Sequence, residues 1–324
     1  MKKNIILLFG ISVLICLLFF LGILLGAEKI PLNEVFLDTS NSLYNLIIFD
    51  IRLPRCILAF ICGILLGGSG CIFQGYFRNS LADPSLLGIS SGATLGVVLS
   101  LNFLNSMFLP LAGFIGAMFS LGVIFTISGK KSLGYEPIKL LLAGNIVNIF
   151  LSSITSLYIL LHDKELYKMY TWTLGSLNGK SWTEVKILII PSIIAMFSFI
   201  IISPHLDILA TGDKTAISLG LSTKKLRIAS LLVGCFANAL AVATLGTVGF
   251  IGIIAPHSSR LFLGASFKKI MPLSMLFGGL LLLFADILCR CLIPPMEIPL
   301  GIITALCGCP FFIALLAKKG KIYG

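Results

Sequence analysis

The stretch FDIRLPRCILAFICGILLGGSGCIFQGYFRNS, residues 49–80, contains a long apolar run with arginines at both ends. No charged residue occurs between Arg55 and Arg78. A helix of this length, rising about 1.5 Å per residue, crosses the roughly 30 Å hydrocarbon core of a bilayer. Similar apolar runs, separated by short charged segments, continue along the chain. The pattern predicts an all-α integral membrane protein.

The composition supports this prediction. The chain is 57% hydrophobic and 11% charged, whereas a soluble domain is about 25% charged. The net charge of +11 would also suit a nucleic-acid-binding protein, but the basic residues occur in short clusters between apolar runs, as in membrane-protein loops. The nine cysteines lie mostly in apolar segments, where a thiol acts as a small hydrophobic group. We therefore expect no nucleic-acid partner and no metal site.

The number of spans follows from the uncharged runs. The run 84–129 is too long for one span and fits two. The run 228–259 is long for one helix and short for two, and LGTVGF (245–250) offers a break. Two spans there give ten in total, with both termini and most of the 24 Lys and Arg residues inside, as the positive-inside rule requires. The predicted spans are 5–26, 56–76, 87–105, 110–128, 139–161, 185–203, 228–246, 248–264, 271–290 and 299–317.

We expect one membrane domain, residues 1–324, with one longer inner loop, 203–227. Thr211 or Asp213 could cap a short helix in this loop, with Gly220 as its stop. Such a helix suits a docking element, and an ordinary basic connector is an equal alternative.

Ionisable groups are scarce inside the predicted spans. Asp286 precedes Arg290 by four residues, the favourable order for a local ion pair. A proton-coupled carrier would need several buried acids, and a membrane enzyme would need clustered His, Asp or Glu. The sequence GSLNGKS (175–181) lacks the first glycine of a phosphate-binding loop. We therefore expect that the chain is not an enzyme and does not bind ATP itself.

Three blocks resemble the FecCD-like permeases of bacterial ABC importers: RLPR…GGSG…Q…RNSLADPSLLGISSGATLG (52–96), GTVGFIGIIAPHSSR (246–260) and ADILCR…EIPLGIITALCGCPFF (285–312). The resemblance implies a type II importer permease fold with ten helices, in the bacterial cell membrane with both termini cytoplasmic. It implies a homodimer, or a pair with a close paralogue. It also implies two ATPase subunits, which use ATP and Mg²⁺, and an extracytoplasmic substrate-binding protein.

The resemblance also assigns residues to roles. It implies that Arg52, Arg55 and Arg290 face outward and receive carboxylates of the binding protein. We expect charge reversal of these arginines to weaken docking without affecting assembly. The segment KTAISLG (214–220) resembles the coupling helix, although Lys214 replaces the usual glutamate, and Ser80 replaces a proline of the first block. The predicted coupling residues are Asp213, Lys214, Thr215, Ala216, Leu219 and Gly220.

Gly67, Gly70 and Gln74 are candidates for the translocation path, with helix packing as the alternative. The resemblance implies a permease subunit for an iron-siderophore, haem or cobalamin. The alternative is a secondary transporter that works alone. The apolar spans contain no pattern that identifies the substrate.

Overall fold

The computed structural model describes residues 2–26, 28, 42–101, 103–104, 108–135, 137–162 and 166–320, and among these residues it contains helices and no strand. In chain order the helices are α1 (Lys2–Leu24), α3 (Ser42–Asn45), the π-helix η1 (Leu46–Arg52), α4 (Leu53–Phe77), the 3₁₀ helix η2 (Pro84–Leu87), α5 (Ile89–Ser100), α6 (Leu109–Tyr135), α7 (Pro137–Leu160), α8 (Leu166–Thr173), α9 (Trp182–Ala210), α10 (Asp213–Ser218), α11 (Thr223–Leu245), α12 (Ile251–Leu263), α13 (Phe267–Cys291) and α14 (Leu300–Gly320).

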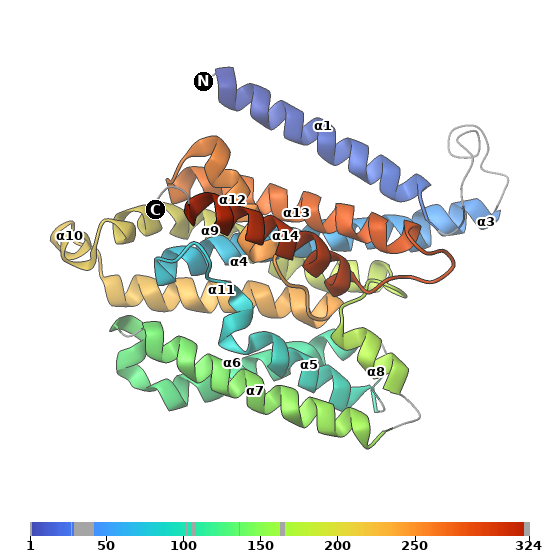
Figure 1. Ribbon diagram of the computed structural model, residues 1–324, viewed down its shortest axis with the longest axis horizontal. Helices are drawn as coiled ribbons and strands as arrows, with labels where there is room; N and C mark the ends of the chain where they lie inside the picture. The colour runs from blue at the N-terminus through green and yellow to red at the C-terminus, as the bar shows by residue number, and fades with distance from the viewer. Residues whose placement is uncertain are drawn as a thin grey trace.

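The long helices run side by side along the longest axis of the molecule (Figure 1). Helix α4 packs against α13, α11, α9 and α12 in the centre, and α5, α6 and α7 pack together on one side. Helix α1 lies on the opposite side against α13. Both chain ends point toward the end that carries α10, which we call the inner end, whereas α3, α8 and the α13–α14 loop lie at the outer end. An even number of crossings requires this placement of the termini.

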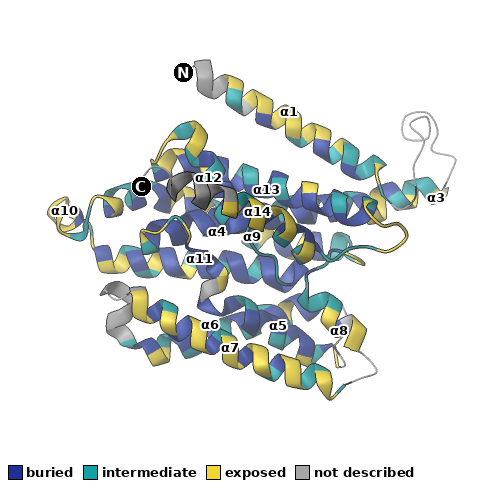
Figure 2. Ribbon diagram, viewed as in Figure 1, coloured by how far each residue is buried: buried dark blue, intermediate teal, exposed yellow. Residues whose placement is uncertain are grey.

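Burial separates central helices from peripheral ones (Figure 2). In the most apolar window of each, the span that contains α4 is 83% buried and α7 is 33% buried. Helix α4 is thus surrounded by protein, while α7 presents much of its surface to lipid or to another chain. A helix that is apolar on all sides suits the central position that α4 occupies.

Glycines bring the central helices close together. Gly63 of α4 lies against the backbone of Gly278, and Gly67 lies against Ser274, both in α13. A Cβ atom at either glycine would overlap that backbone. The GILLGGSG sequence therefore serves the small-residue packing expected of membrane helices.

A helix occupies each of the ten predicted span ranges within the described residues. Six helical segments there are long and apolar enough to cross a membrane, and three more apolar helices are shorter. Helices α5 and α12 have 12 and 13 residues, which at about 1.5 Å per residue gives only ~18–20 Å. The predicted break at 245–250 is present, since α11 ends at Leu245 and α12 begins at Ile251. The chain is a multi-pass membrane protein in which some spans combine a short helix with a turn.

The helix that contains the second predicted span begins before residue 56. Helical structure runs without interruption from Leu43 to Phe77. Pro54 lies in the first turn of α4, and the π-helical turn η1 precedes it. Proline lacks a backbone N–H, and here it follows a π-helical turn and does not begin the helix.

Candidate functional site

Two arginines pair with two carboxylates near the outer end of the molecule, and a third, Arg52, is close to this group. Arg55 pairs through Nε with Oδ1 of Asp286 at 2.8 Å and through Nη1 with Oε1 of Glu297 at 2.8 Å. Arg290 lies 3.0 Å from Oδ2 of Asp286. With Arg52, these residues form a group that we call the outer cluster. Asp286 is fully buried, and each arginine is only 5% exposed.

Arginines of the outer cluster also hold the end of α1. Arg52 donates to the carbonyl oxygens of Ile23 and Leu24, both at 2.7 Å, and Arg290 donates to that of Gly22 at 3.0 Å. The last carbonyl groups of a helix have no partner within the helix, and a cation is favourable there. The arginines thus join α1 to α4 and α13.

These positions change part of the sequence interpretation. The predicted Asp286–Arg290 pair is confirmed, but the arginines expected on the outer surface lie inside the protein. Charge reversal there would place new carboxylates beside buried Asp286, so we no longer expect assembly to survive it. Sequence reasoning missed Glu297, whose side chain is 28% exposed. Its place in the EIPLG segment, near the outer end, was the available signal.

A second ion-pair group lies at the inner end, and we call it the inner clamp. Asp213, the first residue of α10, accepts hydrogen bonds from Arg78 at 2.5 Å and from Arg227 at 2.9 Å. Arg78 also donates to the carbonyl oxygen of Leu209 in α9 at 2.7 Å. Burial of Asp213 opposes its ionisation, but Arg227 and then Arg78 outweigh this and lower the pKa of the carboxyl. One carboxylate thus joins α10 to the ends of α4 and α11, and Arg78 extends the connection to the end of α9.

The short helix predicted in the inner loop is present as α10. Gly220 has a φ of +81°, and the N–H groups of Gly220 and Leu221 bond to Ile217 and Ala216, a Schellman ending that favours glycine. The predicted N-caps were wrong, because Asp213 binds the two arginines and Thr211 donates to Ile208 at 2.8 Å.

Two apolar side chains of α10 and its C-cap are exposed on the surface. Ile217 is 58% exposed and Leu219 is 65% exposed. Lys214 and Thr215 are also exposed, and Ala216 is buried beneath them. Of the predicted coupling residues, Lys214, Thr215, Leu219 and Gly220 are therefore accessible, while Asp213 and Ala216 attach the helix to the protein.

A groove of about 770 Å³ lies between α5, α7, α8, α14 and the 245–250 break, and we call it the polar groove because many Ser, Thr and Asn side chains line it. Asn145, Asn148, Ser152 and Ser156 line it from α7, at a spacing that places them on one helix face. Uncompensated polar groups are costly in contact with lipid. We infer that this face meets water or another protein chain. The sequence analysis missed it, although the polar residues of 139–161 at helical spacing were a usable signal.

The predicted path residues do not lie in this groove. Gly67 packs on α13, and Gly70 packs on the backbone of Gly252 in α12. Gln74 is 2% exposed, and it accepts a hydrogen bond from Arg260 and donates to the carbonyl oxygen of Gly252 at 3.4 Å. Neighbouring helices cover all three in this conformation, which agrees with the helix-packing alternative, and their role in the path stays a prediction.

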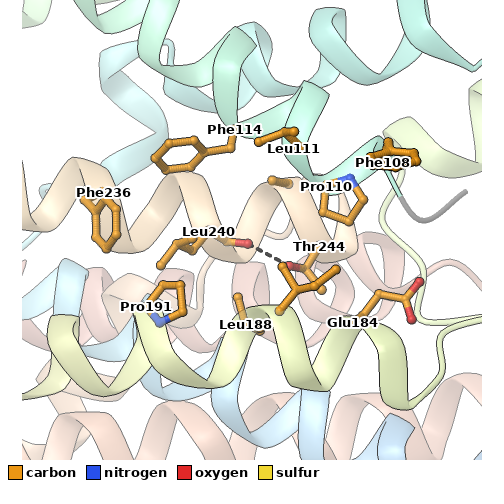
Figure 3. A pocket seen from close by; sticks show the side chains of 12 residues that line it. Phe108, Pro110, Leu111, Phe114, Glu184, Leu188, Pro191, Phe236, Leu240 and Thr244 are labelled. Carbon is orange, nitrogen blue, oxygen red and sulfur yellow. Dashed lines mark hydrogen bonds between the residues drawn. The ribbon is translucent and has the colours of Figure 1, made fainter. Parts of the chain in front are cut away.

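A second pocket, of about 370 Å³, lies between α6, α9 and α11 (Figure 3). Phe114, Leu240 and Pro191 contribute to its apolar wall. Thr244 donates to the carbonyl oxygen of Leu240 at 2.8 Å, and Glu184 accepts from Ser181. Its few polar groups already bond within the chain, so the pocket suits hydrocarbon better than a charged chelate.

Comparison with known proteins places this architecture among transport proteins. Residues 14–318 match the FecCD transport family. The iron(3+)-hydroxamate import system permease protein FhuB of Bacillus subtilis is 35% identical, with 95% of this chain and 82% of that protein covered. The Fe(3+) dicitrate transport system permease protein FecD of Escherichia coli is 33% identical, with 92% and 94% covered.

A solved structure, described as an inward-facing conformation of a metal-chelate type ABC transporter, has the same fold. It superposes with a TM-score of 0.87 and is 29% identical, with 96% of this chain and 99% of that chain covered. The all-α type II importer permease fold inferred from the sequence is confirmed. These findings define the class of the protein as a membrane transport permease. The chain belongs to the FecCD transport family.

Proposed function

We propose that the chain is the permease subunit of an ATP-driven importer for an iron chelate, in the bacterial cell membrane. The relatives named for ferric hydroxamate and ferric dicitrate support this substrate class. The observation that carries the proposal is the polar groove, because a row of amide and hydroxyl side chains along a membrane helix suits the passage of a hydrophilic cargo.

The groove is open on one side, so one chain supplies only part of a path. We propose that a second copy of the chain, or a close paralogue, supplies the opposite wall. The exposed polar residues of α7, such as Asn145 and Ser152, would then face their counterparts across a water-filled space. The α7 face would be covered in the complex, which removes its unfavourable contact with lipid.

At the outer end we propose docking of a substrate-binding protein through its carboxylates. In the structure, Arg55 already pairs with the partly exposed Glu297. A carboxylate of the binding protein can replace Glu297 without leaving a buried charge unpaired, since Arg55 keeps Asp286. Arginine suits this exchange because it stays charged and binds carboxylates in a fork geometry. If a carboxylate of the binding protein replaces Glu297 in this way, Arg55 can take part in docking although it is buried.

At the inner end we propose that two ATPase subunits, which use ATP and Mg²⁺, bind α10. The exposed Ile217 and Leu219 fit an apolar pocket on such a partner. Lys214, Lys224 and Lys225 are exposed around them and favour an acidic rim on the partner. Movement of the ATPase would then reach the permease through α10.

A stand-alone secondary transporter is the alternative function. Among the described residues that line the groove, the polar groups come from Ser, Thr, Asn and Tyr and from no carboxylate. A proton-coupled carrier uses intramembrane acids as its relay. The lining therefore favours energy supply by a partner.

The test is uptake of ⁵⁵Fe-labelled ferric hydroxamate and ferric citrate into proteoliposomes that contain the chain with its ATPase and binding protein. We expect uptake that requires ATP and both partners. Uptake by the chain alone, driven by a proton gradient, would establish the alternative.

A further inference from the structure

We propose that Asp213 is a positioning residue, which fixes the coupling helix α10 to three long helices so that a displacement of α10 is passed to them. This inference rests on the proposed function, since it concerns how ATPase movement reaches the membrane helices. It assigns Asp213 a role distinct from partner contact.

The contacts of Asp213 are with the protein itself. Its Oδ1 accepts from both Arg78 and Arg227, and its Oδ2 accepts from Arg227 at 3.2 Å. Arg227 is 4% exposed, and its guanidinium lies 5.8 Å from the ring centre of buried Tyr76. Asp213 therefore reaches from an exposed loop to a cation inside the bundle, and the cation needs this carboxylate because it is buried.

The clamp includes the end of α9 as well. Arg78 occupies the left-handed C-cap of α4, with a φ of +51°, and donates both to Asp213 and to Leu209 of α9. Helix α10 follows α9 after only Thr211 and Gly212. The last turn of α9 and the first turn of α10 are thus held by the same guanidinium group.

A further contact continues this connection to α13. Asp207 of α9 accepts hydrogen bonds from the N–H groups of Phe267 at 2.5 Å and Lys268 at 3.1 Å, and from the hydroxyl of Ser266 at 2.9 Å. It thereby caps the start of α13, whose last turn carries Arg290 of the outer cluster. A shift of the α9 end has a continuous path of packed, hydrogen-bonded groups to the outer end.

The test compares Asp213→Asn with wild type in the complete complex, reconstituted with its ATPase and binding protein. The measured quantity is ferric chelate transported per ATP hydrolysed, with the ferric hydroxamate and ferric citrate probes above. We expect ATP hydrolysis to continue while transport per ATP falls about fivefold or more, the lower range of typical coupling factors. Asp213→Glu keeps the carboxylate and should recover most of the coupling. Asp50→Asn, the same change at an exposed carboxylate of η1, is the matched control.

A second measurement uses the permease alone. Amide hydrogen exchange in α10 should become faster in Asp213→Asn, while exchange in the middle of α9 and α11 stays unchanged. Unchanged transport per ATP, or a proportional fall of hydrolysis and transport, would overturn the proposal. If wild type shows no ATP-driven uptake, the proposed function fails. The exchange rates then test the role of Asp213 by themselves, and unchanged exchange in α10 would refute the clamp.

Discussion

The two ends of the molecule use the same residue types for different purposes. In the outer cluster, Asp286 is fully buried, and Arg55 and Arg290 surround it. In the inner clamp, the side chain of Asp213 is 42% exposed and pairs with one buried and one partly exposed arginine. The first arrangement joins the ends of long helices, whereas the second holds a short helix at the surface.

The difference shows how burial decides what an ion pair does. A buried pair offers little net stability over an apolar replacement, but the loss of one partner is costly because a charge stays behind. The loss of a pair that is partly in water costs less. The outer cluster therefore suits a joint inside the bundle, and the inner clamp suits the attachment of a short surface helix. Four predictions test this contrast.

The largest effect is expected at the buried carboxylate. Asp286→Asn leaves Arg55 and Arg290 buried without their shared partner, and should lower the free energy of unfolding by about 3–5 kcal/mol. Unfolding of the purified protein in a mixed-detergent titration measures this value. In the same assay, Asp213→Asn should lower the free energy of unfolding by clearly less than Asp286→Asn does. Equal costs for the two variants would remove the contrast between the clusters.

The second prediction compares substitutions of the two arginines of the inner clamp. Arg227→Gln removes the 4% exposed partner of Asp213 and should lower the free energy of unfolding by about 1–3 kcal/mol, since a buried charge-assisted hydrogen bond is lost. Arg78→Gln removes a partner whose side chain is 39% exposed and should cost about 0–1 kcal/mol. The reverse order would mean that burial does not set the strength of this clamp.

The third effect concerns Glu297. Glu297→Gln keeps the shape of the side chain but removes the charge that competes for Arg55, so the binding protein should dock several-fold more tightly. The permease itself should lose about 1 kcal/mol or less, because Glu297 is partly in water. Surface plasmon resonance with the loaded binding protein measures the affinity. Weaker docking would indicate that Glu297 orders the docking surface instead of competing with it.

The smallest effect is the pH dependence of the inner clamp. The pKa of Asp213 is lowered in the folded protein, so its contribution is present above the ordinary carboxyl pKa of about 3.9. It is lost as pH falls through the lower folded-state value. The difference in melting temperature between wild type and Asp213→Asn should stay constant from pH 7 to about 5 and shrink below pH 4. A difference that disappears near pH 6 would contradict the assigned ion pairs.

Much of the fold was predictable because lipid imposes a simple rule on sequence. The apolar runs and the charge asymmetry indicated ten helices, and LGTVGF marked a break that the structure contains. The Asp286–Arg290 pair followed from helical spacing alone. The pairing of Arg55 with Glu297, and of Asp213 with Arg227, could not be predicted, because tertiary packing brings together residues that are distant in sequence.

For the candidate path residues, too, the sequence could not decide between two roles. Glycine runs suit both cavity walls and close helix contacts. The structure shows helix contacts, because Gly70 lies against Gly252 and Gly67 lies against Ser274. The Ser and Asn residues of α7 were visible in the sequence. Their meaning depended on knowing that this face of the helix is left uncovered by the rest of the chain.

The most direct test of the proposed importer is ferric chelate uptake in proteoliposomes that carry Ser152→Trp in the groove. The indole should narrow the path and reduce ATP-dependent uptake at least tenfold, with the complex intact. The matched control, Ile201→Trp, adds the same side chain at a 66% exposed position on α9 and should transport like wild type. Wild-type rates in Ser152→Trp, or uptake without the ATPase, would contradict an ATP-driven path through this groove.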